Sequence, residues 1–357
     1  MAADSLGWDR AVAFADQTLD RLSSIGLPLP GDGAQLLSRR SLFTSAPRDQ
    51  QQSMGGWCRL LPSSDGWIAI HLPREDDLEL LPAWIGISAS SANPPWDEIG
   101  TSVRTYTSDH IVRSAQELGL AVSMVPTHND DEQLVDRGTA NPARPWIQRR
   151  VGERGAGRPL DGLRVVDLSS LWAGPLCARV LGDGGARIVK VESPSRPDAS
   201  RDGDAALFEW LHADHEFRSI AFDESDGVAE LVELLEHADV VIEGSRPRAL
   251  DRLGIAPAEI VAKRPGTVWV SITAYGRCGP WRDRVGFGDD TAVAGGLIEV
   301  DANGRPGFVG DAVADPLTGL VAAALVADAV LRGGGVTIDV ALREVARSAA
   351  RSAQVVW

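Results

Sequence analysis

The chain has 357 residues, of which 44% are hydrophobic and 24% are charged, and its formal net charge is −15 at pH 7. This length is enough for two domains, and the composition is that of a soluble globular protein. The negative charge argues against nucleic acid or an anionic membrane surface as the main partner. No stretch approaches the uninterrupted apolar length of a membrane span, so no membrane association is expected.

The cysteines Cys58, Cys177 and Cys278 lie far apart in the sequence, and no two of them are spaced as CxxC. Neither a zinc site nor a disulfide framework is therefore expected, which fits a reducing cytosol. The first residues lack the basic and apolar regions of a secretory signal. These features predict a cytoplasmic protein.

The first part of the chain divides into three predicted segments. Residues 1–53 form an N-terminal helical segment, with helices expected at 9–24 and 34–43 on either side of a Pro- and Gly-rich break. Residues 54–127 predict a small α+β domain, with strands expected at 57–61, 67–72 and 121–125 and helices near 76–85 and 108–118. Residues 128–158 are polar and rich in Arg, Gly and Pro, which is typical of a linker.

Residues 159–357 alternate short apolar, β-branched runs with helical segments. Strands are expected at 163–168, 187–191, 219–222, 240–243, 268–273 and 336–340. This alternation predicts an α/β fold, in which a Rossmann-like, mostly parallel sheet carries helices on both faces and binds ligands at the carboxyl ends of its strands. A nicotinamide or flavin enzyme is not favoured, because no G-x-G-x-x-G follows the first strand.

The segment 309–319 delivers one carboxylate, Asp315, to the start of an apolar helix. Pro316 suits the first turn of such a helix, where its missing N–H is not needed. A carboxylate at or near the N-cap accepts backbone N–H bonds and is favoured by the helix dipole. Local sequence therefore favours a structural cap, and any catalytic role depends on the rest of the chain.

Several phrases follow one another in a fixed order over residues 158–350. They are Pro159–Ser169, Ala173–Pro175, Gly185–Glu192, Asp198–Arg201, Arg218–Asp223, Ala238–Glu243, Arg246–Gly254, Tyr275–Pro280, Asp315-x-x-x-Gly319 and Gly333–Val340. Together they resemble the class III coenzyme A-transferase family, which includes formyl-CoA and carnitine CoA-transferases and α-methylacyl-CoA racemases. Residues 65–70 and 118–122 resemble the small domain of that family, which here precedes the large domain.

The resemblance implies that Asp315 is the nucleophile of a CoA-transferase. It would attack the thioester of an acyl-CoA donor, form a mixed anhydride and then an aspartyl-CoA thioester, and pass coenzyme A to a carboxylic acid. An aspartate with the ordinary pKa of about 3.9 is ionised at neutral pH and needs no general base. The resemblance also implies a homodimer, with coenzyme A as a substrate and with no permanently bound cofactor or metal.

By position, the resemblance places the contacts with coenzyme A on Ser170, Leu171, Trp172, Ala173, Ser193, Phe222, Gly244, Ser245, Arg246 and Arg252. Arg246 and Arg252 are candidates for its phosphates, because a guanidinium group binds phosphate in a bidentate manner. Both are also open to interpretation as solvated surface arginines. Trp172, like Trp210, has the residue type more often found in a hydrophobic core.

Two alternatives to a transferase stay open. A racemase needs an acid/base pair, and the racemases carry a histidine where this chain has Phe287, so transfer is favoured over racemisation. Asp289 and Asp290 are candidate bases, although a pair at a helix N-terminus is the simpler interpretation. The other alternative is a catalytically degenerate CoA-binding partner. For an active enzyme we expect the small domain to dock over the carboxyl-end loops of the large sheet and so over the Asp315 site, either in its own subunit or in a partner's, because water destroys a mixed anhydride.

Overall fold

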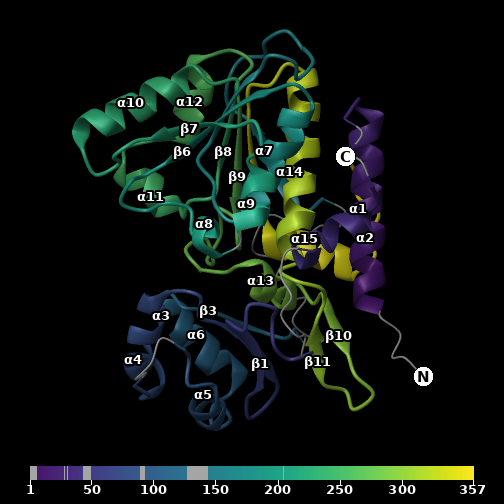
Figure 1. Ribbon diagram of the computed structural model, residues 1–357, viewed down its shortest axis with the longest axis vertical. Coiled ribbons are helices and arrows are strands. Elements are labelled where there is room, and N and C mark those ends of the chain that lie inside the picture. Colours follow the sequence, from purple (N-terminus) through teal and green to yellow (C-terminus); the bar gives the residue numbers. More distant parts are fainter. Residues whose placement is uncertain are drawn as a thin grey trace.

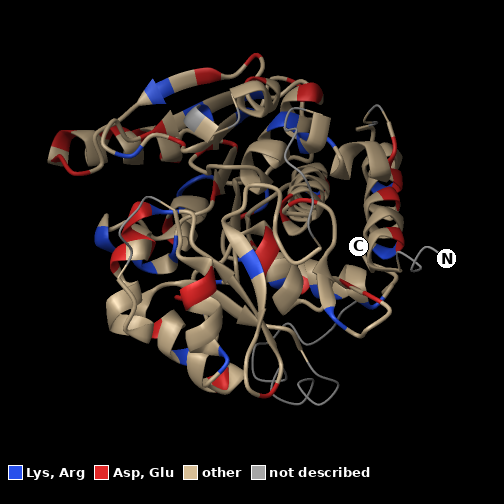
Figure 2. Cartoon of the chain, turned by 60° about the horizontal axis from the view of Figure 1, so that its bottom comes forward, with Lys and Arg blue, Asp and Glu red and all other residues tan. Residues whose placement is uncertain are grey.

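The computed structural model of the protein describes residues 6–42 without 28 and 30, and residues 50–88, 93–126, 144–203 and 205–357. Within these residues the strands form a seven-stranded sheet, a three-stranded sheet and a two-stranded hairpin (Figure 1). The predicted combination of a mostly parallel sheet with a small α+β unit is confirmed. Lys and Arg are interspersed with Asp and Glu in the view of Figure 2.

The seven-stranded sheet has the strand order β4-β12-β9-β8-β5-β6-β7. Its strands are β4 (Trp146–Arg150), β5 (Arg164–Asp167), β6 (Arg187–Glu192), β7 (Glu216–Ser219), β8 (Val240–Glu243), β9 (Val268–Thr273) and β12 (Val336–Ala341). All neighbouring pairs are parallel except β4 and β12, which are antiparallel. The carboxyl ends of six strands therefore meet at one edge of the sheet, where ligands bind in folds of this kind.

Helices cover both faces of this sheet, as predicted (Figure 1). Val165 of β5 points to one face and Val166 to the other, because successive side chains of a strand alternate. The first face packs against α7 (Ala173–Asp183), α9 (Ala205–Leu211) and α14 (Ala314–Leu331). The second packs against α10 (Ser225–Glu236), α11 (Pro247–Arg252) and α12 (Pro257–Lys263). The short helix α8 (Ser200–Gly203) precedes α9.

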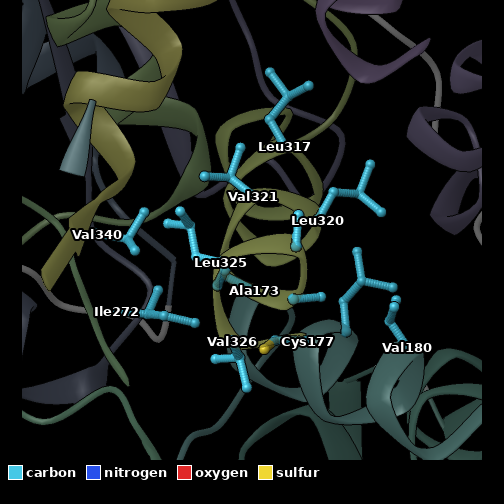
Figure 3. Close-up of a cluster of buried hydrophobic side chains, with 14 of the residues drawn as sticks. Ala173, Cys177, Val180, Ile272, Leu317, Leu320, Val321, Leu325, Val326 and Val340 are labelled. Carbon is cyan, nitrogen blue, oxygen red and sulfur yellow. The ribbon is translucent and has the colours of Figure 1, made fainter. Parts of the chain in front are cut away.

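The helix α14 lies at the centre of the main hydrophobic core. Figure 3 shows its residues Leu317, Leu320 and Val321 together with Cys177 and Val180 of α7. By length and composition alone α14 is able to cross a membrane, but 83% of this 18-residue apolar segment is buried inside the protein. Such burial is typical of the core helix of a globular domain.

The N-terminal helices are part of the large unit. They are α1 (Leu6–Ser24), α2 (Gly33–Leu37) and the 3₁₀ turn η1 (Arg40–Leu42). Phe14 and Leu22 of α1 belong to the same core as α14 and as α15 (Leu342–Ala350). Figure 1 shows α1 running beside α14 and close to the C-terminus.

Within the described residues, the small unit consists of the antiparallel sheet β1-β2-β3 and four helices. Its elements are β1 (Cys58–Pro62), β2 (Trp67–His71), β3 (Ala121–Met124), α3 (Glu75–Glu79), α4 (Leu81–Ile85), α5 (Trp96–Val103) and α6 (Ser108–Leu118). Ile68 and Ile70 of β2 face these helices. Ala69 faces the opposite way and packs with Cys58 against Val293 of α13 (Gly288–Ala294).

Among the differences from the sequence-based expectation, three concern the strands. The predicted linker at 128–158 is wrong at Trp146–Arg150, which form the edge strand β4, and residues 127–143 lie outside the described residues. β7 covers Glu216–Ser219 instead of 219–222, since an edge strand needs no continuous apolar face. The short hairpin of β10 (Ile298–Val300) and β11 (Pro306–Phe308) was not predicted.

Candidate functional site

Asp315 lies in the first turn of α14, at the second residue of the helix. The turn before it is unusual, because Gly310 and Ala312 have φ angles of +61° and +44°. The left-handed region is uncommon for a residue other than glycine, and such conformations occur where the surrounding structure imposes them. The Asp315 N–H donates to the Ala312 carbonyl oxygen at 2.9 Å, which closes the turn.

The carboxylate of Asp315 does not cap the helix. The N-cap of α14 is Val313, no side chain caps this helix, and the half-buried Asp315 carboxylate accepts no hydrogen bond from the described residues. The expectation that Asp315 stands at the helix start is confirmed, but its interpretation as a hydrogen-bonding cap is wrong. The Asp315 carboxylate therefore lies next to the N-terminus of α14 but accepts none of its backbone N–H groups.

The start of α13 forms the opposite side of the site. Asp289 is buried, and its Oδ1 accepts a hydrogen bond from the Ala312 N–H at 2.8 Å. Asp290 is fully buried, and its Oδ1 accepts the Phe287 N–H at 2.7 Å. The interpretation of these two aspartates as a helix N-terminal pair is therefore confirmed. Gly288 precedes them, and a side chain there would collide with Asp315 Oδ2.

These surroundings raise the pKa of Asp315 to about 7. Burial is the largest cause, because it disfavours the charged form, and the negative charges of Asp289 and Asp290 add to it. Arg40 and His71 act in the opposite direction. The expectation of an ordinary aspartate, ionised without help at neutral pH, is wrong: near pH 7 the free site is divided between its protonated and ionised forms.

Two side chains of this site were missed at the level of sequence. Arg40, in η1, lies 3.2 Å from Asp311 and lowers the pKa of Asp315. His71, at the end of β2, places Nδ1 3.2 Å from Asp290 Oδ1. The signal for His71 was the alternation in β2: Ile68 and Ile70 face the small-unit helices, so His71 must face the other way. No comparable pattern marks Arg40.

Transfer was favoured over racemisation because residue 287 is phenylalanine and not histidine. The position of His71 weakens this preference. The two rings pack with their centroids 4.9 Å apart, and His71 also interacts electrostatically with Asp315. An imidazole therefore stands beside residue 287 although the sequence carries phenylalanine there. The small unit thus docks at the Asp315 site, as predicted, and the Ser123 hydroxyl adds a 2.8 Å hydrogen bond to the Asp290 carbonyl oxygen.

The predicted contacts with coenzyme A follow β5, β6, β7 and β8, which are adjacent in the sheet. The structure thus brings their loops to one edge. Ser170 and Leu171 are exposed, whereas Trp172 and Ala173 are buried in the core. Of the others, the exposed residues are Gly244 and Arg252, the half-buried ones are Phe222, Ser245 and Arg246, and the buried one is Ser193.

A buried lysine organises the loops after β5 and β6. Lys190 Nζ lies 3.3 Å from Asp198 and 3.8 Å from Asp167, and it donates to the Ser169 carbonyl oxygen. Asp198 in turn accepts the N–H of Leu171, whose φ is +70°. Burial alone would raise the pKa of Asp198, but Lys190 and the hydrogen bonds hold it below the ordinary value. The cluster therefore fixes an exposed loop in a strained conformation.

Arginines gather where this edge meets the small unit. Burial lowers the pKa of Arg246, and so do the positive charges of Arg248, Arg74 and Arg196. Arg74 also donates to the Gly119 carbonyl oxygen at 3.1 Å, which places it at the end of α6. This concentration of positive charge contrasts with the net charge of −15 for the chain.

Comparison with known proteins assigns the chain to a family. Residues 160–355, more than half of the chain, match CoA-transferase family III. The chain belongs to CoA-transferase family III. The matched span includes Asp315 and every predicted contact with coenzyme A, but not the small unit, whose resemblance to the family's small domain stays a prediction.

Individual relatives cover a similar span. Succinyl-CoA–D-citramalate CoA-transferase of Chloroflexus aurantiacus is 32% identical over 200 residues, 52% of this chain and 50% of that protein. Succinyl-CoA:glutarate CoA-transferase of Mus musculus is 31% identical over 216 residues, 57% and 50% of the two chains. A CAIB/BAIF family protein from Brucella suis, known from its crystal structure, is 31% identical, with a TM-score of 0.48 over 54% of this chain and 55% of that one. The chain spans about half the length of the curated relatives it matches.

Proposed function

We propose that the protein is a class III CoA-transferase that moves coenzyme A from an acyl-CoA to a carboxylic acid through Asp315. The observation that carries this proposal is the Asp315 carboxylate itself. It lies within the family match, it is fixed by a strained turn, and it accepts no hydrogen bond from the described residues. A carboxylate held in this way is available for covalent chemistry.

The reaction would begin when an oxygen of the Asp315 carboxylate attacks the thioester carbonyl carbon. A C–O bond forms, the C–S bond breaks, and the mixed anhydride and the CoA thiolate result. The thiolate then attacks the Asp315 carbonyl and releases the donor acid, which leaves an aspartyl-CoA thioester. The acceptor carboxylate repeats these two steps in reverse order, so that the acceptor leaves as its CoA thioester and Asp315 is regenerated.

The site offers two kinds of assistance to these steps. The small unit, docked on α13, would shield the anhydride from water. Gly288 has no side chain, which lets Asp315 Oδ2 and the Ala312 carbonyl oxygen pack closely against the start of α13. The raised pKa of Asp315 adds a requirement, because only its ionised form is a nucleophile.

Coenzyme A is proposed to bind as a substrate along the carboxyl edge, which is the edge of the seven-stranded sheet where the carboxyl ends of six strands meet. Arg246 and Arg252 would lie near its phosphates. Trp172 and Ala173 would contribute through their backbone, since their side chains are buried in the core. The proposal includes a cytoplasmic homodimer without a permanently bound cofactor. Both curated relatives described above carry succinyl-CoA in their names, so succinyl-CoA is the first donor to test.

Trapping the covalent intermediate tests the proposal. The protein is incubated with succinyl-CoA and then with hydroxylamine, and its peptides are examined by mass spectrometry. A hydroxamate on Asp315, absent from Asp315→Ala, is the expected result. Asp328, also on α14, provides the matched control, since Asp328→Ala should label normally. If coenzyme A binds but no aspartate is labelled with any acyl-CoA, the degenerate partner becomes the better interpretation.

A racemase-like isomerase is the second candidate, and His71 is the observation that favours it. An imidazole paired with Asp290 near Asp315 supplies the acid/base pair that α-proton exchange needs. The test is incorporation of deuterium at the α-carbon of a 2-methylacyl-CoA in heavy water, followed by NMR. We expect no incorporation from a transferase, whereas enzyme-dependent exchange without labelling of Asp315 would establish the isomerase instead.

A further inference from the structure

We propose that His71 accepts the proton of Asp315 and thereby prepares this carboxylate for attack. This inference rests on the proposed transferase function. His71 acts through Asp315, so we describe it as a positioning residue. It comes from the small unit, outside the span that matches the family, which gives the small unit a chemical role in addition to covering the site.

The geometry fixes which nitrogen of His71 takes part. Nδ1 faces Asp290 Oδ1 at 3.2 Å, and the side chain of His71 is only 12% exposed. Asp290 is itself held by the Phe287 N–H, and the ring of Phe287 packs against the imidazole. A carboxylate at Nδ1 keeps the proton on that nitrogen. Nε2 has no hydrogen-bond partner among the described residues and is therefore the nitrogen that exchanges a proton.

Charge balance favours transfer of the proton from Asp315 to His71. The groups around His71 are Asp289 and Asp290 on α13, Asp315 on α14 and Cys58, its partner across the β1–β2 pair. Arg40 is a nearby permanent cation among the described residues, and it contacts Asp311. Releasing the Asp315 proton to water would leave another uncompensated negative charge in a buried site, which is costly. Moving that proton to His71 keeps the net charge constant.

The pKa directions agree with this balance. The pKa of Asp315 is raised to about 7. Burial lowers the pKa of His71, but Asp290, Asp289 and Asp315 outweigh it, so the pKa is raised overall. The pKa values of both groups are therefore raised above their ordinary values near 3.9 and 6.5. Only a proton moves in this step, from an Asp315 oxygen to His71 Nε2, and the resulting imidazolium and the ionised Asp315 carboxylate then attract each other.

A structural role for His71 must be separated from this chemical one, because the histidine also ties the small unit to α13. Ser123 serves as the matched control, since its hydroxyl forms another tie to α13 without a titrating group. The variants are His71→Gln and Ser123→Ala in the full chain. The measurement is the pH profile of kcat/KM for transfer from succinyl-CoA.

Removing His71 should move the acidic limb of the profile to higher pH by about one unit, because His71 lowers the pKa of Asp315. At pH values above that limb the rate should stay within a few-fold of the unmodified protein. Ser123→Ala should leave the limb in place. An unchanged limb in His71→Gln, or an equal loss of rate at every pH, would overturn the inference.

A second measurement does not depend on the folding of a His71 variant. The imidazole pKa of His71 can be followed by NMR in the unmodified protein and in Asp315→Asn. The neutral amide removes a charge that raises the His71 pKa, so this pKa should fall, and an unchanged value would contradict the coupling. Failure of the proposed function is recognised separately, because the unmodified protein would then give no hydroxamate at Asp315.

Discussion

Asp289 Oδ1 accepts the Ala312 N–H at 2.8 Å, which joins the first turn of α13 to the strained turn before Asp315. Asp289 and Ala312 are 23 residues apart in sequence, and this bond holds Asp289 against the turn that leads to Asp315. Asp289 therefore has two opposing effects. It positions the nucleophile, and its charge raises the pKa of that nucleophile.

Replacing Asp289 with asparagine should separate these effects. The amide oxygen can still accept the Ala312 N–H, while the negative charge is lost. We expect the pKa of Asp315 to fall, so that the acidic limb of kcat/KM for transfer moves to lower pH by about one unit. This shift is opposite in sign to that expected for His71→Gln. If the acidic limb of kcat/KM does not move, Asp289 affects Asp315 only by positioning it and not through its charge.

The ionisation of Asp315 should also appear in the stability of the protein. Its pKa is about 7 in the folded state and about 3.9 in the unfolded chain. Between these values the folded state holds a proton that the unfolded state has released, so the contribution of Asp315 to stability decreases as pH rises. Asp315→Asn does not titrate. Its Tm relative to the unmodified protein should therefore increase from pH 5 to pH 8, and a pH-independent difference would contradict the raised pKa.

Gly288 is expected to tolerate no side chain. A Cβ at this position would meet Asp315 Oδ2 and the backbone carbonyl oxygen of Ala312, and the backbone cannot move aside as a flexible side chain can. Gly288→Ala should lower the transfer rate by displacing Asp315. Gly203→Ala is the control, because no heavy atom of the described residues lies within 4 Å of a Cβ there. Normal rates in both variants would show that the turn at Ala312 adapts.

Much of this fold could be predicted because its central strands are buried on both faces. β8 and β9 are buried along their whole length, and their predicted bounds agree with the structure. The edge strands β4 and β7 were missed or shifted, since they carry charged, exposed residues. The predicted positions of Asp315, Asp289 and Asp290 follow from helix-start signals. The pKa of Asp315 could not be predicted, because it depends on burial and on His71, more than two hundred residues away in the sequence.

Lys190 offers a test of how the carboxyl edge is held together. It is fully buried between Asp167 and Asp198, so Lys190→Met leaves these carboxylates without their cation. Removing one partner of a buried ion pair typically costs about 3–5 kcal/mol. Urea unfolding should show a loss of this order. The double variant Lys190→Met/Asp198→Asn should recover part of it, because one uncompensated charge is then removed, and no recovery would argue against the pair.

Arg246 provides the test of the proposed phosphate contacts. It is half-buried and lies near Arg248, Arg74 and Arg196, whose charges lower its pKa and would attract a phosphorylated ligand. A hydrogen bond to a charged group contributes about 1.5–3 kcal/mol, so Arg246→Gln should weaken coenzyme A binding by roughly 10- to 100-fold in calorimetry.

Two controls make this result specific. Arg218→Gln should leave the affinity unchanged, because Arg218 is exposed on β7 and paired with Glu216 at 3.0 Å. Pantetheine, which carries no phosphate, should bind Arg246→Gln as well as it binds the unmodified protein. If the binding of coenzyme A and of pantetheine were weakened equally, Arg246 would maintain the structure of the carboxyl edge and would not bind phosphate.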